Sequence, residues 1–202
     1  MNPDFVKSAG ILLGGVLATI APYVASWIKK KYNKSDESTT FLHNAEYRIK
    51  INEVLVEIRT LTGANRVIVL EYHNGNTAIT GLPFNYASMT YERTDQTTRE
   101  MMMNFQKVPI SPFCELLLDV QNSDQGVVRV DAIYKHQEVV KFNKFHGVEI
   151  EYVYRIGGNI KAGTVHLMWI NTEPFLTADQ QQEVYYKVMY IDELMTKMKK
   201  YK

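Results

Sequence analysis

Hydrophobic and polar positions divide the chain into an apolar segment, a polar linker and a longer patterned region. Residues 9–28 carry no charge, and a helix of that length is long enough to cross a bilayer. Residues 29–40 are charged and polar without an apolar period, as is typical of a tether. We therefore predict an N-terminal apolar helix in residues 1–28, acting as a membrane anchor, a basic and polar tether in residues 29–40, and a folded domain in residues 41–202.

The folded domain is expected to begin and end with a helix. In residues 41–62 apolar residues recur three or four positions apart, and Gly63 follows as a typical helix stop. Thr177 and Gln180 have the spacing of a capping box, which predicts the start of a last helix. Between them the pattern predicts strands at 66–72, 86–93, 127–133, 148–156 and 160–170, and helices at 96–107, 112–120 and 135–146. The expected fold class is α+β, with helices flanking a mostly antiparallel sheet.

Basic residues next to the apolar segment predict its orientation. Four lysines lie in residues 29–34, whereas one lysine precedes the segment, so the positive-inside rule places the C-terminal domain in the cytoplasm, at the inner membrane. Gly10, Gly14 and Ala18 recur every four residues and form a candidate face for close helix packing. Two alternatives stay open at this point, a cleaved signal peptide and a buried helix of a soluble or virion protein.

Composition and motif spacing exclude several function classes. The net charge of +1 gives no general field for nucleic acid. The single cysteine, Cys114, permits no disulfide within the chain, which suits a reducing compartment. The histidines lack metal-site spacing, and neither a phosphate-binding glycine loop nor a nucleophile elbow is present. We therefore predict a protein that is not an enzyme and that has no metal and no cofactor.

The stretch RVIVLEYHNG, residues 66–75, is the one place where polar residues of possible chemistry follow a buried strand. Glu71 and His73 alternate along the strand and so share a face. With Tyr86 and Ser88 of the next strand they form a weak candidate ligand site. The preferred interpretation of His73 is structural, because Asn74-Gly75 is a strong turn pair that the histidine ring can order.

At its two ends the domain resembles the GAF family. Gly163, Leu167, Phe175, Thr177 and Asp179 match the strand, phenylalanine, cap and closing helix of that family, and LTGANRVIVLEYHNG is similar to its opening. The resemblance spans roughly residues 45–196. It implies a GAF-like (PAS-like) sheet with an open face that can receive a small ligand. It also implies pairing of two copies through the flanking helices.

A narrower resemblance involves small single-pass GAF-like proteins of tailed bacteriophages. Arg66, Val67, Tyr72, His73-Asn74-Gly75 and the set Ser88, Thr90 and Glu92 match their pattern. The cyclic-nucleotide signature of the GAF family is incomplete after Asn143, and Cys114 lacks the histidine that usually follows a bilin-bearing cysteine. The expected function is a membrane-anchored, non-catalytic module that senses a small ligand or docks a protein. A structural or ejected virion component and a lysis-related membrane protein are the alternatives.

Overall fold

The computed structural model describes residues 22–24, 26, 42–73, 85–157, 163–170 and 176–199 of the 202 residues. Contacts divide the chain into two units, residues 1–46 with 201–202 and residues 47–200. In the first unit the described residues 22–24, 26 and 42–46 are helical. The second unit holds the sheet and the candidate site, and everything below concerns it unless stated.

One part of the predicted fold class, the transmembrane helix, is wrong. Among the helices in the described part of the chain, none is both long and apolar enough to cross a membrane. Its longest helix, α4 (Ala178–Lys199), has charged residues in every turn from Glu183 onward. Most of residues 9–28, with Gly10, Gly14 and Ala18, and all of the tether lie outside the described residues. The fold class is corrected to an antiparallel sheet flanked by helices.

Six strands form one antiparallel sheet in the order β3-β2-β1-β6-β5-β4. Five of them lie in the predicted ranges, and the short β3 was not predicted. At the centre, β1 and β6 approach closely where β6 begins. Gly163 has φ +136°, and a Cβ at that position would collide with the carbonyl oxygen of Leu70. The strands are β1 (Arg66–His73), β2 (Tyr86–Thr94), β3 (Val108–Pro109), β4 (Val127–Val130), β5 (Ile150–Arg155) and β6 (Thr164–Trp169).

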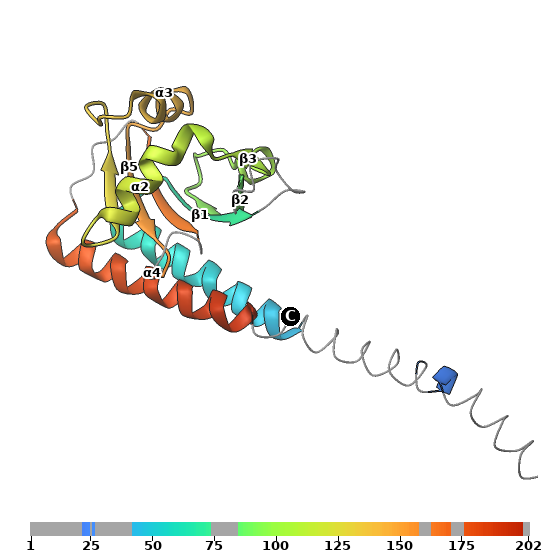
Figure 1. The fold of residues 1–202 in the computed structure, drawn as a ribbon. Coiled ribbons are helices and arrows are strands. Elements are labelled where there is room, and N and C mark those ends of the chain that lie inside the picture. The colour runs from blue at the N-terminus through green and yellow to red at the C-terminus, as the bar shows by residue number, and fades with distance from the viewer. Residues whose placement is uncertain are drawn as a thin grey trace, which may run out of the picture. The chain divides into compact units, whose positions relative to one another are not determined.

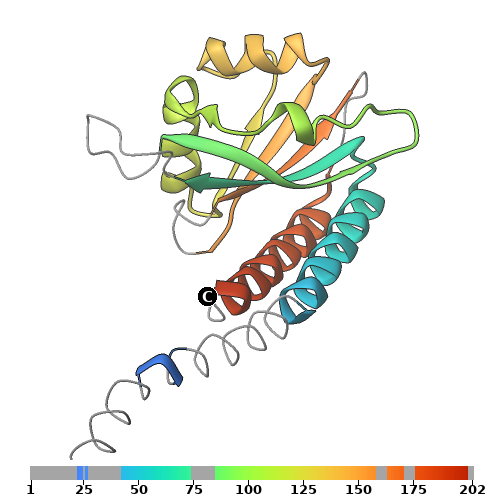
Figure 2. The ribbon, with the colours of Figure 1, turned by 90° about the vertical axis from the view of Figure 1, so that its right-hand side faces the viewer.

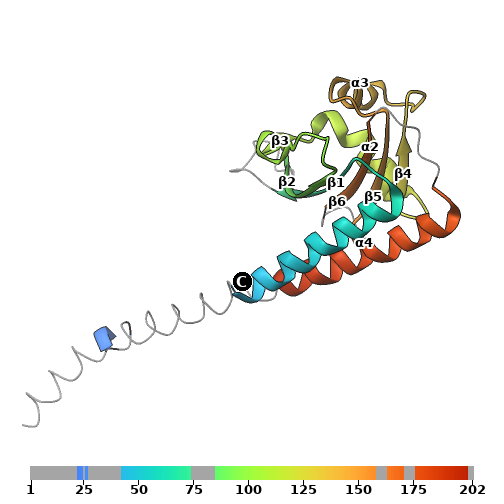
Figure 3. The same ribbon diagram turned by 180° about the vertical axis from the view of Figure 1, so that it is seen from behind.

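Two long helices, residues 47–62 and α4, cover one face of the sheet side by side and antiparallel (Figures 1 and 3). Gln180 Nε2 donates to the Leu61 carbonyl oxygen at 3.0 Å, and Lys187 Nζ lies 2.7 Å from Glu57. The predicted capping box is confirmed, because the Gln180 N–H donates to Thr177 Oγ1 and the Thr177 N–H donates to Gln180 Oε1. The main apolar core lies between these helices and the sheet.

Shorter segments cover the other face (Figure 2). They are η1 (Met102–Asn104), η2 (Ser111–Phe113), α2 (Cys114–Asn122) and α3 (Gln137–Phe145). A second, smaller core forms where α2 and α3 meet β4 and β5, around Val153, which is fully buried. The two faces of the sheet are therefore covered differently, by long helices on one side and by short ones on the other.

The helix predicted at 96–107 is wrong, because this segment has only the one 3-10 turn of η1. Backbone groups that an α-helix would use are bound elsewhere. The N–H groups of Met101 and Met102 donate to the carboxylate of Glu92, and the Arg99 carbonyl accepts from Arg66. Contacts with β1 and β2 thus override the local preference of the methionine cluster for a helix.

Candidate ligand cavity

A cavity lies on the short-helix side of the sheet, and the alternation of β1 explains which residues reach it. Side chains of a strand point alternately to its two faces. Val67 and Val69 enter the main core, whereas Ile68, Leu70 and Tyr72 line the cavity on the opposite side. Residues from β2, β5, β6, α2 and α3 and from the segments before α2 and after α3 complete the wall.

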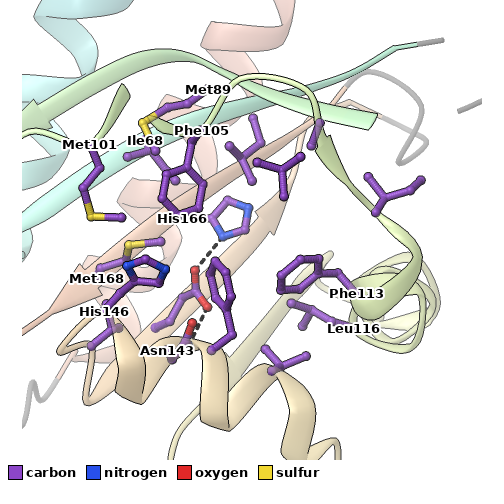
Figure 4. Close-up of a pocket in the computed structure, with 18 of the residues that line it drawn as sticks. Ile68, Met89, Met101, Phe105, Phe113, Leu116, Asn143, His146, His166 and Met168 are labelled. Carbon is purple, nitrogen blue, oxygen red and sulfur yellow. Dashed lines mark hydrogen bonds and ion pairs between the residues drawn. The ribbon is translucent and has the colours of Figure 1, made fainter. Parts of the chain in front are cut away.

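The wall is mainly apolar and contains flexible side chains. Figure 4 shows Met89, Met101 and Met168 near the ring of Phe105, with Phe113 and Leu116 on the far side. The cavity volume is about 60 Å³, well below the roughly 150 Å³ of an engineered apolar cavity that binds benzene. Methionine side chains adapt their shape easily. A ligand larger than a few water molecules therefore requires these side chains to move.

A line of hydrogen-bonded side chains runs along the wall of the cavity, from β1 across β6 and β5 to α3. Tyr72 Oη lies 2.7 Å from Thr164 Oγ1, which lies 2.7 Å from His166 Nε2. His166 Nδ1 lies 2.6 Å from Glu151 Oε1, and Asn143 Nδ2 donates to Glu151 Oε2 at 2.8 Å. In Figure 4, dashed lines join His166 and Asn143 to the carboxylate between them. Burial raises the pKa of Tyr72 well above its usual value, so its hydroxyl keeps a proton to donate.

Thr164, His166 and Glu151 have the order of a nucleophile, a base and an orienting acid. The hydroxyl of Thr164 is nevertheless out of reach. Thr164 has no exposed surface and is not among the residues that line the cavity, and Tyr72 occupies the other side of its oxygen. The arrangement therefore holds buried polar groups in place and offers no attacking atom to a bound molecule.

Arg66, which also lines the cavity, belongs to a buried ion pair. Arg66 Nε lies 3.0 Å from Glu92 Oε1, and their side chains are only 3% and 2% exposed. Burial lowers the pKa of Arg66, and the neighbouring carboxylate of Glu92 opposes this shift. Burial also lowers the pKa of His146, which lines the cavity, and the charge of Arg66 adds to that shift. His146 is thus favoured in its neutral form.

The four residues of the sequence-based site, Glu71, His73, Tyr86 and Ser88, come together at one end of β1 and β2. His73 Nε2 lies 2.8 Å from Ser88 Oγ, and the rings of His73 and Tyr86 stack with centroids 6.2 Å apart. None of the four is among the residues that line the cavity. By strand alternation Glu71 and His73 belong to the same face as Val67 and Val69. Their predicted role in ligand binding stays a prediction, and Asn74-Gly75 lies outside the described residues.

The residues that line the cavity were not predicted as a site from the sequence. Arg66 and Glu92 appeared only as part of a motif, and Glu151, His166 and Asn143 were not singled out for binding. One available signal was an ionisable residue inside a run of aliphatic and aromatic residues, as Glu151 is in IEYVY and His166 is in TVHLMW. Buried charges are rare unless they are paired, so such positions mark polar contacts within a core.

No protein-family model matches the sequence, and no curated protein matches it. Several solved structures, however, are similar to this chain in fold. The GAF domain of PixJ from Thermosynechococcus elongatus, in its blue-light-absorbing form, aligns with a TM-score of 0.58 at 10% identity over 78% of this chain and 89% of that one. The fold is GAF-like.

Other photoreceptors give the same result. A GAF domain from Synechocystis in its photoproduct state aligns with a TM-score of 0.54 at 12% identity, over 72% of this chain and 90% of that one. The photosensory core module of the Stigmatella aurantiaca phytochrome aligns with a TM-score of 0.56 at 11% identity, over 81% and 37%. The structural similarity confirms the predicted GAF-like fold. At such low sequence identity it indicates no specific activity. None of these three is a phage protein, and the predicted phage origin stays a prediction.

Proposed function

We propose that the domain is a non-catalytic sensor that binds a small, mostly apolar molecule in the cavity between the sheet and the α2–α3 side. The cavity itself carries this proposal. It has a mostly apolar wall, a few placed polar groups and an adaptable methionine surface, which is the usual composition of a small-molecule site. The GAF-like fold agrees with a sensing role by analogy only.

Methionine methyl groups provide a direct test. With the methyls of all methionines labelled with carbon-13, the full chain is titrated with toluene, indole and xenon. The resonances of Met89, Met101 and Met168 should shift together and saturate, because these residues line the cavity. Met103 is 87% exposed and serves as the internal control, whose resonance should stay unchanged.

A pair of matched variants completes the test. Ala87→Leu places a larger side chain in the cavity wall and should weaken probe binding at least tenfold. Ala132→Leu makes the same change at an exposed position and should leave binding unaltered. The absence of saturable shifts with all three probes, or undiminished binding by Ala87→Leu in a folded protein, would contradict the proposal.

Self-association through the long helices is a second candidate function, and exposed aromatic residues on α4 favour it. Tyr186 and Tyr190 are 64% and 42% exposed and lie one turn apart, with Met189 38% exposed beside them. Sedimentation of the full chain at micromolar concentration should show a dimer. Tyr186→Glu with Tyr190→Glu should then yield a folded monomer, and a monomeric wild-type chain would reject this candidate.

Phage origin, virion association and a lysis-related role stay predictions of the sequence, as does the cytoplasmic location of the domain. A mass-spectrometric inventory of purified virions from a producing strain would decide the virion alternative, in which this chain should be present at a fixed number of copies.

A further inference from the structure

Among the described residues of the cavity wall, Arg66 is a charged group with one nitrogen that makes no hydrogen bond. Arg66 lines the cavity and is 2% exposed. Its Nε donates to Glu92 and its Nη2 donates to the Arg99 carbonyl at 2.7 Å. Its Nη1 is buried and has no hydrogen-bond partner among the described residues. A guanidinium nitrogen is a hydrogen-bond donor and cannot accept, so Arg66 Nη1 lacks an acceptor.

Glu92 does not supply that acceptor, because its two oxygens accept from Arg66 Nε and from the N–H groups of Met101 and Met102, and Nη1 is left without a partner. Oε1 accepts from Arg66 Nε and from the Met101 N–H, and Oε2 accepts from the N–H groups of Met101 and Met102. A carboxylate has about four acceptor positions. Glu92 therefore leaves Nη1 without an acceptor, and a molecule bound in the cavity that Arg66 lines could provide one.

We propose that the ligand of this cavity is a small apolar molecule with one carboxylate, and that the carboxylate binds Arg66 Nη1 while the apolar part lies against the methionines and Phe105. This inference rests on the proposed function and adds the chemical class of the ligand. Hydrogen bonds between a guanidinium and a carboxylate are roughly twice as strong as those between neutral groups. The low polarity of the wall strengthens them further.

The surroundings of Arg66 select against a ligand with more than one charge. Among the described residues that line the cavity, Arg66 is the one guanidinium or ammonium group, and its charge is shared between Glu92 and one ligand carboxylate, while Glu151 lies elsewhere in the wall. A second anionic group would meet these carboxylates without a counter-charge, at a cost that burial makes large. His146, which also lines the cavity, is favoured as a neutral ring and so adds no further positive charge.

Pairs of acids and alcohols of equal chain length test the inference without changing the protein. Butanoate is compared with butan-1-ol, and hexanoate with hexan-1-ol, by methionine-methyl titration at pH 7.5. Each acid should bind at least tenfold more tightly than its alcohol. The guanidinium nitrogen resonance of Arg66, assigned by its absence in Arg66→Lys, should shift with the acids and stay in place with the alcohols.

Succinate tests the limit of one charge on the ligand, and the Arg66→Lys variant tests the role of the guanidinium. Succinate should bind at least tenfold more weakly than butanoate, because of its second charge. In Arg66→Lys, if folded, the acid should lose its advantage over the alcohol, since an ammonium does not reproduce the planar fork. Equal affinity of acid and alcohol would show that water satisfies Nη1 and would overturn this inference, while the proposed function would stand. Failure of acids, alcohols and uncharged probes alike would reject both.

Discussion

Replacement of Glu92 by glutamine should lower the free energy of unfolding of the domain substantially. The substitution keeps the shape of the side chain but removes its charge, which leaves Arg66 as an uncompensated cation inside the protein. Both side chains are almost fully buried, at 3% and 2% exposure. Breaking a buried pair by removing one partner costs about 3–5 kcal/mol.

The melting temperature follows from this free energy. For a domain of this size, about 1 kcal/mol shifts the midpoint by roughly 2–4 °C, so Glu92→Gln should melt roughly 6–20 °C below the wild type. Urea unfolding, followed by circular dichroism, measures the free-energy change directly. Amide exchange at Met101 and Met102 should also accelerate, because their N–H groups lose a charged acceptor.

A surface ion pair provides the control. Glu138 and Lys141 are 74% and 69% exposed, and Glu138→Gln should change stability by less than about 1 kcal/mol. The double variant Arg66→Met with Glu92→Gln should be no less stable than Glu92→Gln alone, since the orphaned charge is gone. If Glu92→Gln stays within about 1 kcal/mol of the wild type, the pair does not hold the segment in the way described.

Three further predictions concern single positions. His73→Ala should lower the free energy of unfolding by about 1–2 kcal/mol, because Ser88 loses a hydrogen-bond partner; an unchanged urea midpoint would contradict it. Gly163→Ala should be strongly destabilising in thermal melts, because a Cβ meets the Leu70 carbonyl at a positive φ, and a wild-type melting temperature would refute that clash. For His146 the folded-state pKa is lowered, so the unfolded chain binds the proton more readily and stability should fall as the pH drops below about 6.5. His146→Phe should flatten that part of the pH profile of the melting temperature, and an identical profile would count against it.

Elements with strong local signals were predictable from the sequence. The helix before Gly63 follows the three-to-four spacing of its apolar residues, and α4 begins at the capping box of Thr177 and Gln180. The segment at 96–107 was not predictable, because its backbone conformation depends on a carboxylate from a different strand. Local pattern contains no information about such a partner.

The site was harder to predict than the fold, for a reason that lies in the sheet. Alternation along β1 indicates two faces but does not say which segments cover each of them. Contact between Arg66 and Glu92 further depends on the register of β1 and β2, in which Ile68 pairs with Glu92. That register includes an irregularity after Val69, where the pairing of the two strands shifts by one residue. A turn sequence such as His-Asn-Gly is visible in the sequence, whereas a diagonal pair across strands is not.

The two faces of the sheet are covered by different elements, and their packing should therefore open at different free energies. Against the long helices the sheet buries its largest side chains completely, among them Trp169 at 2% and Tyr154 at 1% exposure, and a displacement there would cost close packing across the main core. On the other face the cover consists of 3-10 turns and two nine-residue helices, and Met101 and Phe105 are only partly buried. Regions with fewer buried contacts open at lower free energy. If the proposed function is right, a molecule that enters the cavity from this side should displace methionines and a 3-10 turn, while the packing of the opposite face is kept.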